Sequence, residues 1–202
     1  MNAASLQHLS DADPVMARLI ERIGPCNLKP RRLPPFQSLV KAIIYQQLSG
    51  KAAETILGRF QALFGDGEFP TPEQVLQIHS DRIRAAGLSR PKVSYVRGLG
   101  EHAVAGRLPT LKACDRLTDA EIIERFTEVK GVGRWTAEMF LIFNLGRPDV
   151  LPVLDLGVRK GFQIAYGKRK LPESEPLERF GAKWKPHRTA AAWYLWRAVD
   201  SL

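Results

Sequence analysis

The chain has 202 residues, 45% of them hydrophobic, and its 30 Lys and Arg outnumber its 21 Asp and Glu to give a formal net charge of +9. Such a chain can bury the core of one domain or two small lobes, and its charge favours a polyanion such as DNA, the alternative being a basic surface with no such partner. Cys26 and Cys114 are its only cysteines, which argues against a disulfide framework and excludes a four-cysteine zinc or iron–sulfur site from this chain alone.

The N-terminal residues 1–8 lack the basic segment and long apolar segment of a signal peptide. No apolar run approaches the roughly 18 residues that a membrane span requires. We therefore expect an intracellular protein without membrane contact, in the cytoplasm and nucleoid or, in a eukaryote, the nucleus.

Apolar residues recur at helical spacing along nearly the whole chain. The first predicted helix follows candidate caps at Ser10, Asp11 and Asp13, and a later one follows a Thr-x-x-Glu capping box at Thr118 and Glu121. The predicted helices cover residues 11–24, 36–47, 51–64, 73–78, 80–86, 91–106, 118–129, 135–145, 156–166 and 187–199. No alternating pattern of useful length predicts a strand, so we expect an all-α fold.

The segment Val129–Ala137 reads Val-Lys-Gly-Val-Gly-Arg-Trp-Thr-Ala and is the most distinctive motif of the chain. Gly131 and Gly133 flank one apolar residue, which permits a tight turn with positive φ and leaves backbone N–H groups pointing outward. A helix that begins at Arg134 adds further donors. The motif predicts a hairpin that grips a DNA phosphate through its backbone and the side chains of Lys130 and Arg134.

Three blocks together resemble the helix-hairpin-helix superfamily of DNA glycosylases, and within it the 3-methyladenine DNA glycosylase II family, which excises alkylated bases. The blocks are Ala42-Ile-Ile-Tyr-Gln-Gln-Leu-Ser49, the hairpin segment Val129–Ala137, and Trp184-Lys-Pro-His-Arg188, with Asp155 between the last two. The resemblance covers about Phe36 to Arg197. It implies two helical lobes, approximately 36–145 and 1–35 plus 146–202, with an active-site cleft between them and no N-terminal β domain.

The resemblance also implies the chemistry, which is hydrolysis of an N-glycosidic bond in duplex DNA that contains alkylated bases, by a monomer. Asp155 is the expected catalytic carboxylate, because it would stabilise the positive charge that builds on the sugar and orient the attacking water. Asp155 is also placed to cap the helix that starts at Leu156, and the two roles are compatible. Trp135 stands where strand-cleaving relatives carry a lysine nucleophile, so a monofunctional enzyme that leaves an abasic site is expected.

The expected base pocket consists of Trp135, Trp196, Met139, Leu156, Tyr45 and Gln46, the aromatic faces attracting a cationic base. For the tryptophans the alternative is core packing. Met139 and Leu156 stand where some relatives place tyrosines. Gln47 or Leu48 is expected to fill the gap that the flipped base leaves, although a solvated helix end is the alternative.

The resemblance further implies a monovalent cation, Na⁺ or K⁺, held by the carbonyls of Thr127, Lys130 and Val132, and no required cofactor. The histidines have no spacing that suggests a transition metal. Further candidates for phosphate contacts are Lys160, Lys183, Lys185 and Arg188. Two alternative functions remain: a non-catalytic DNA-binding or damage-sensing module, and a bifunctional glycosylase–lyase, which Trp135 disfavours.

Overall fold

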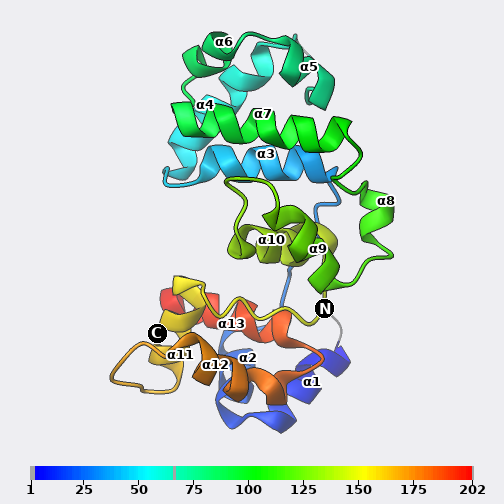
Figure 1. Cartoon of the computed structure of the whole chain (residues 1–202). Helices are drawn as coiled ribbons and strands as arrows, with labels where there is room; N and C mark the ends of the chain where they lie inside the picture. Colours follow the sequence, from blue (N-terminus) through cyan, green and yellow to red (C-terminus); the bar gives the residue numbers. More distant parts are fainter. Residues whose placement is uncertain (1–2, 66, 202) are drawn as a thin grey trace. The chain divides into compact units, whose positions relative to one another are not determined.

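The computed structural model describes residues 3–65 and 67–201, and every regular element in these residues is a helix (Figure 1). The predicted all-α fold is therefore confirmed. The chain divides into two compact units, unit 1 with Met1–Arg31 and Leu141–Leu202 and unit 2 with Arg32–Phe140. None of the helices in the described residues has the length and apolar character needed to cross a membrane.

Unit 1 is built around the C-terminal helix α13, against which α1, α2 and α11 pack (Figure 1). The small residues Ala190, Ala191 and Ala192 of α13 are fully buried and allow this close packing. In chain order the helices are α1 (Ala3–Ala12), α2 (Pro14–Ile23), a π-helical turn η1 (Leu141–Leu145), α11 (Leu156–Ala165), α12 (Ser174–Phe180), a 3₁₀ turn η2 (Gly181–Trp184) and α13 (Arg188–Ser201).

A buried carboxylate, Asp13, joins three parts of unit 1 that are far apart in sequence. It caps α2 by accepting a hydrogen bond from the Val15 amide at 2.9 Å. It also accepts hydrogen bonds from the Tyr166 hydroxyl at 2.6 Å and the Trp184 indole N–H at 2.9 Å, and Lys183 Nζ lies 3.1 Å away. Although burial opposes it, these donors lower the pKa of the Asp13 carboxyl below its ordinary value.

Asp13 should therefore make the stability of the protein sensitive to acid. Because its folded-state pKa is lowered, its contribution is present above the ordinary value of 3.8 and is lost as the pH falls through the folded-state pKa. We expect Asp13→Asn, which keeps a capping side chain, to reduce the free energy of unfolding by roughly 2–3 kcal/mol at pH 7. Urea unfolding measured across the acid range should show a shallower loss of stability for the variant, and an unchanged slope would contradict this role.

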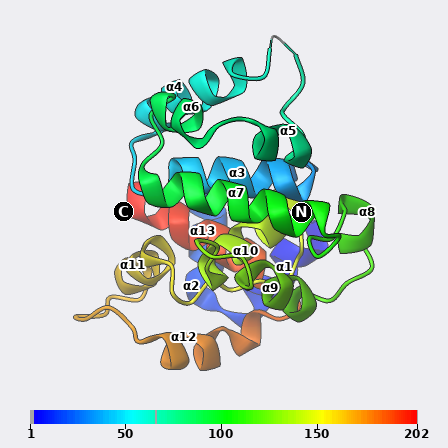
Figure 2. The same cartoon turned by 45° about the horizontal axis from the view of Figure 1, so that its top comes forward.

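Unit 2 contains the middle helices, with α3 and α7 lying side by side in both views (Figures 1 and 2). The α3 residues Leu39, Val40, Ile43 and Ile44 are almost fully buried. The helices are α3 (Pro35–Tyr45), α4 (Gly50–Ala62), α5 (Pro72–Gln77), α6 (Ser80–Ala85), α7 (Arg90–Val104), α8 (Leu111–Cys114), α9 (Asp119–Thr127) and α10 (Arg134–Phe140). Helix α10 packs against α9 and α3. This packing fixes the ends of the hairpin segment that connects α9 to α10.

The predicted helices agree with the structure except at the ten-residue α1, which was not predicted, and where a helix is short or divided. The capping box is confirmed: Thr118 Oγ1 accepts from the Glu121 amide at 3.3 Å, and the Glu121 carboxylate accepts from the Thr118 amide at 2.7 Å. The predicted helix at 11–24 was wrong at its start, because Ser10 and Asp11 belong to α1 and only Asp13 caps α2. The short helices α8 and α12 and the turn η2 were not predicted, since four to seven residues give too little periodicity.

Candidate functional site

The hairpin between α9 and α10 has the geometry that its glycines predict. Gly131 has a φ of +91°, and a side chain there would overlap the ring of Tyr95 on α7, which lies directly beneath. Val129 and Val132 are buried and anchor the turn. A side chain at Gly133 would meet no atom within 4 Å. In the described chain the Gly131 and Gly133 amides have no acceptor, so both N–H groups are available to an anion.

The loop after α3 is fastened to the hairpin by side-chain hydrogen bonds within unit 2. Gln46 Nε2 donates to the carbonyl oxygen of Gly131 at 2.9 Å. Lys92 Nζ donates to the carbonyls of Ile44 at 2.8 Å and Gln46 at 2.6 Å, and burial lowers the pKa of this lysine. These bonds hold the loop in place where α3 ends. Lys92 belongs to no sequence motif, so its role in holding the loop could not be predicted from the sequence.

Gln47 and Leu48, the two candidates for filling a vacated base position, follow this fixed point. Gln47 has a φ of +57°, a left-handed conformation that costs a non-glycine residue about 1–2 kcal/mol. Leu48 is 39% exposed, and both residues line a cavity of about 190 Å³ together with Ser89 and Lys92. The loop therefore presents an apolar side chain and an amide side chain at the surface of unit 2 from a backbone that is held rigidly.

In unit 1, Asp155 is the N-cap of α11, and two N–H groups donate to its side chain. Its Oδ1 accepts a hydrogen bond from the Val158 amide at 2.8 Å, which is the N-cap contact that the sequence allowed. The same oxygen accepts a hydrogen bond from Trp196 Nε1 at 2.8 Å. The indole of Trp196 is stacked on Phe143 of the π-helical turn, with ring centres 5.4 Å apart and an angle of 28°. The carboxylate is thus held by donors from α11 and α13, and Phe143 supports the indole that supplies one of them.

The absence of a side chain at Gly157 allows Trp196 to approach Asp155 closely enough to form their hydrogen bond. A Cβ at this position would lie 2.8 Å from Trp196 Cδ1 and 3.1 Å from Asp155 Oδ1. Such distances require the indole or the carboxylate to move. Sequence reasoning identified neither Gly157 nor Phe143, because both act through contacts that form only when the unit folds.

The other predicted base-pocket residues are divided between the units. In unit 2, Trp135 is 44% exposed and Tyr45 is 40% exposed, while Met139 is half-buried. In unit 1, Leu156 is 64% exposed, and Trp196 lines a cavity of about 380 Å³ with Phe143 and Gly157. The rings of Trp135 and Tyr45 are therefore partly exposed and are not fully buried in the core of unit 2.

Two cationic side chains that the sequence offered as phosphate contacts have partners inside unit 1. Lys183 pairs with the buried Asp13. Arg188 binds Asp149 through two parallel hydrogen bonds, from Nε at 2.7 Å and from Nη2 at 2.9 Å, and despite burial these bonds lower the pKa of the Asp149 carboxyl. Both residues organise unit 1. On the hairpin side, Arg134 Nε donates to the buried carboxylate of Glu138 at 2.9 Å.

The oxygen atoms proposed for a monovalent cation have the right chemistry. In the described chain the carbonyls of Thr127, Lys130 and Val132 accept no hydrogen bond, whereas the carbonyls of Val129 and Gly131 do. Uncharged carbonyl oxygens are ligands that suit hard cations. No group of three or more His, Cys, Asp or Glu side chains among the described residues could hold a metal ion.

Comparison with known proteins confirms the resemblance. Residues 40–187 match the model of the HhH-GPD superfamily of base excision DNA repair proteins. DNA-3-methyladenine glycosylase 1 of Schizosaccharomyces pombe is 39% identical over 194 residues, which are 94% of this chain and 84% of that protein. The alkylbase DNA glycosidase-like protein mag2 of the same species is 33% identical, covering 95% of this chain and 91% of that protein.

Solved structures of 3-methyladenine DNA glycosylases are also similar to this chain. The S. pombe 3-methyladenine DNA glycosylase (Mag1) in complex with abasic DNA has a TM-score of 0.85 and 38% identity, covering 96% of both chains. The DNA-3-methyladenine glycosidase of Bacillus halodurans has a TM-score of 0.90 and 38% identity, covering 99% of this chain and 91% of that one. The chain belongs to the HhH-GPD superfamily and, within it, to the 3-methyladenine DNA glycosylase family.

Proposed function

We propose that this chain, a DNA-3-methyladenine glycosylase of base excision repair, flips alkylated purines out of duplex DNA and hydrolyses their N-glycosidic bond with water, with Asp155 as the catalytic carboxylate. It acts as a monomer inside the cell, where its DNA substrate lies. The observation that carries the proposal is the Asp155 carboxylate, held by the Val158 amide and the Trp196 indole at 2.8 Å each. Two donors on one oxygen fix the orientation that a transition-state contact requires.

Cleavage of the bond between sugar and base builds positive charge on the sugar, and a carboxylate near the anomeric carbon stabilises that charge. A unit charge pair at about 4 Å with an effective dielectric constant near 20 is worth roughly 4 kcal/mol, or about a thousandfold in rate. Asp155 would also orient the water that attacks the sugar. A purine alkylated at N3 or N7 is already cationic, so its departure needs no general acid.

Trp135 supports a mechanism that uses water rather than an enzyme amine. Formation of a Schiff base with the sugar requires an amine, and an indole cannot supply one. We expect a duplex with a single 7-methylguanine to be converted to an abasic strand that breaks only after alkali. No covalent complex should be trapped by borohydride. Strand breakage without alkali, or a trapped complex, would establish the glycosylase–lyase alternative instead.

Unit 2 offers the groups that would hold the DNA. A relative has been crystallised in complex with abasic DNA. We assign the amides of Gly131 and Gly133, with Lys130 and Arg134, to one phosphate, and Gln47 or Leu48 to the gap left by the flipped base. Trp135 and Trp196 each present an electron-rich ring, which attracts a cationic alkylated base.

A monovalent cation at the carbonyls of Thr127, Lys130 and Val132 would add positive charge beside the phosphate-binding amides. These three carbonyls accept no hydrogen bond in the described residues, which supports the assignment. We expect affinity for an abasic-site duplex to be higher in KCl or NaCl than in tetramethylammonium chloride at equal ionic strength. Equal affinities would argue against the cation and leave the glycosylase assignment untouched.

Gly157→Ala should impair the chemistry without impairing DNA binding. The added methyl group displaces Trp196 or Asp155, and a misplaced catalytic group costs about 10²-fold in rate. Single-turnover release of 7-methylguanine measures the effect, and binding of an abasic-site duplex should stay at the wild-type level. Gly58→Ala, in an open position on α4, serves as the matched control. A Gly157→Ala enzyme with the wild-type rate would show that the contact between Trp196 and Asp155 has no role in positioning.

A further inference from the structure

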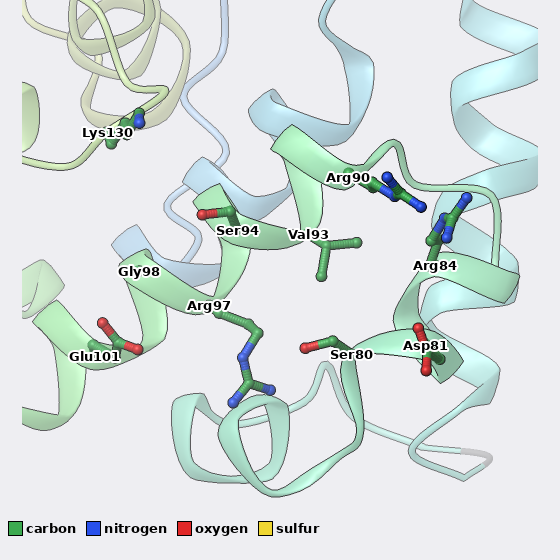
Figure 3. Close-up of a pocket in the computed structure, with 10 residues that line it drawn as sticks. All are labelled: Ser80, Asp81, Arg84, Arg90, Val93, Ser94, Arg97, Gly98, Glu101 and Lys130. Carbon is green, nitrogen blue, oxygen red and sulfur yellow. The ribbon is translucent and has the colours of Figure 1, made fainter.

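A groove of about 590 Å³ follows one face of α7 in unit 2 (Figure 3). Helix α7 supplies Arg90, Ser94, Arg97 and Glu101, α6 supplies Arg84, and the hairpin supplies Lys130. Of the residues assigned above to the glycosylase site, Lys130 alone lines the groove. The groove is therefore a surface outside the candidate catalytic site that begins at the phosphate-binding hairpin.

The groove is predominantly basic, and two of its arginines lie together at its outer end. Arg84 and Arg90 come from different helices, yet Figure 3 shows their guanidinium groups gathered at one end. Both are exposed, and neither forms an ion pair in the part of the chain that the structure describes. Asp81 lies at the same end, but in the described residues its carboxylate forms no ion pair with either arginine. Two neighbouring like charges repel each other, and a bound anion relieves that repulsion.

Arg97 lines the middle of the groove, between the end with Lys130 and the end with Arg84 and Arg90, and its side chain is held in place. Its guanidinium donates to the carbonyls of Val75, Leu76 and Ile78, at 3.4, 3.2 and 3.0 Å, and so satisfies the C-terminal end of α5. Its charge remains in the groove while its donors are used within the protein. Arg97 is thus a structural member of the groove, and Arg84 and Arg90 are the members with donors available to a ligand.

We propose that this groove binds the phosphodiester backbone of the DNA substrate beyond the phosphate held by the hairpin. The proposal rests on the proposed glycosylase function. Lys130 makes the groove continuous with the hairpin, and Ser94 adds a hydroxyl along α7 between Lys130 and Arg90 (Figure 3). Basic groups distributed from one end of the groove to the other fit an extended polyanion better than one small anion. Arginine is the side chain best suited to phosphate oxygens.

The salt dependence of DNA binding tests the proposal. The probe is a fluorescently labelled duplex with a central tetrahydrofuran abasic analogue, titrated with protein at several KCl concentrations. Each phosphate contact contributes about 0.9 to the slope of log K against log[salt], so R84Q/R90Q should reduce the steepness by about 1.8. Shortening the duplex on one side of the abasic analogue should remove the phosphates that the groove binds. With that shortened duplex, R84Q/R90Q and the wild type should have the same slope. Glu101→Gln removes a negative charge from the groove and should tighten binding.

The matched control is R59Q/R82Q, which removes the same charge from exposed positions of unit 2 that do not line the groove. If both double variants shift the slope equally, only net charge matters and the proposal is overturned. It is also overturned if inorganic phosphate binds the wild type but not R84Q/R90Q while the DNA slopes agree. If the wild type binds DNA but releases no base, the glycosylase proposal is refuted. The comparison of salt slopes would still show whether the groove binds the DNA backbone.

Discussion

Asp155→Asn is expected to lower the single-turnover rate of alkylated-base release by about a thousandfold or more, because it removes the negative charge that opposes the positive charge on the sugar. Asparagine keeps the shape of the side chain. Its amide oxygen can still accept the hydrogen bonds from the Val158 amide and Trp196 Nε1, and it is a good N-cap for α11. The substitution therefore separates the charge of Asp155 from its capping role.

Two controls accompany this measurement. Binding of the abasic-analogue duplex should stay within a few-fold of the wild type, and thermal unfolding should show that the variant remains folded. If Asp155→Asn released base at the wild-type rate, the residue would be only a helix cap and the catalytic assignment would be wrong. A rate that falls together with the unfolding temperature would mean that the carboxylate acts through the stability of unit 1.

Gly161→Ala is expected to have the largest effect on stability, because α11 crosses α13 at this glycine. A methyl group at Gly161 would overlap the backbone carbonyl of Leu195, and a backbone atom cannot turn aside as a side chain can. Forcing the helices apart should cost at least about 3 kcal/mol and lower the midpoint of thermal unfolding by roughly 6–12 °C. Unfolding followed by circular dichroism gives both quantities.

Gly58→Ala is the matched control for that prediction. Gly58 lies inside α4, where an added Cβ would meet no atom within 4 Å. The same substitution should therefore stabilise the protein by about 0.5–1 kcal/mol, the ordinary preference of a helix for alanine. A Gly161→Ala variant as stable as the wild type would mean that α11 and α13 can separate without losing their packing.

Helical periodicity predicted the larger helices because these have one buried face. Helix α3 is buried through an unbroken apolar stripe, and α9 carries its capping box in the sequence itself. The division between α1 and α2 escaped that reasoning, although Pro14 favours the first position of a new helix. Helix α12 gives too weak a signal, since Leu177 is its only residue that is buried in unit 1.

The candidate site was predictable where its chemistry depends on residue type at a fixed spacing. The glycine pattern predicts the positive φ of Gly131, and the family motif marks Asp155. The contacts that hold these groups depend on tertiary structure. Tyr95 beneath the hairpin, Lys92 at the end of α3 and Phe143 under Trp196 come from segments with no motif of their own. Such supports become visible only when the helices are assembled.

The most direct test of the central claim is the release of free bases from duplex DNA treated with a methylating agent. Purified wild-type protein should liberate 3-methyladenine or 7-methylguanine, identified by chromatography, in proportion to enzyme and time, and should leave the strands unbroken until alkali is added. Tight binding to abasic-analogue DNA with no release of any alkylated base would contradict the account and identify the protein as a non-catalytic DNA-binding module.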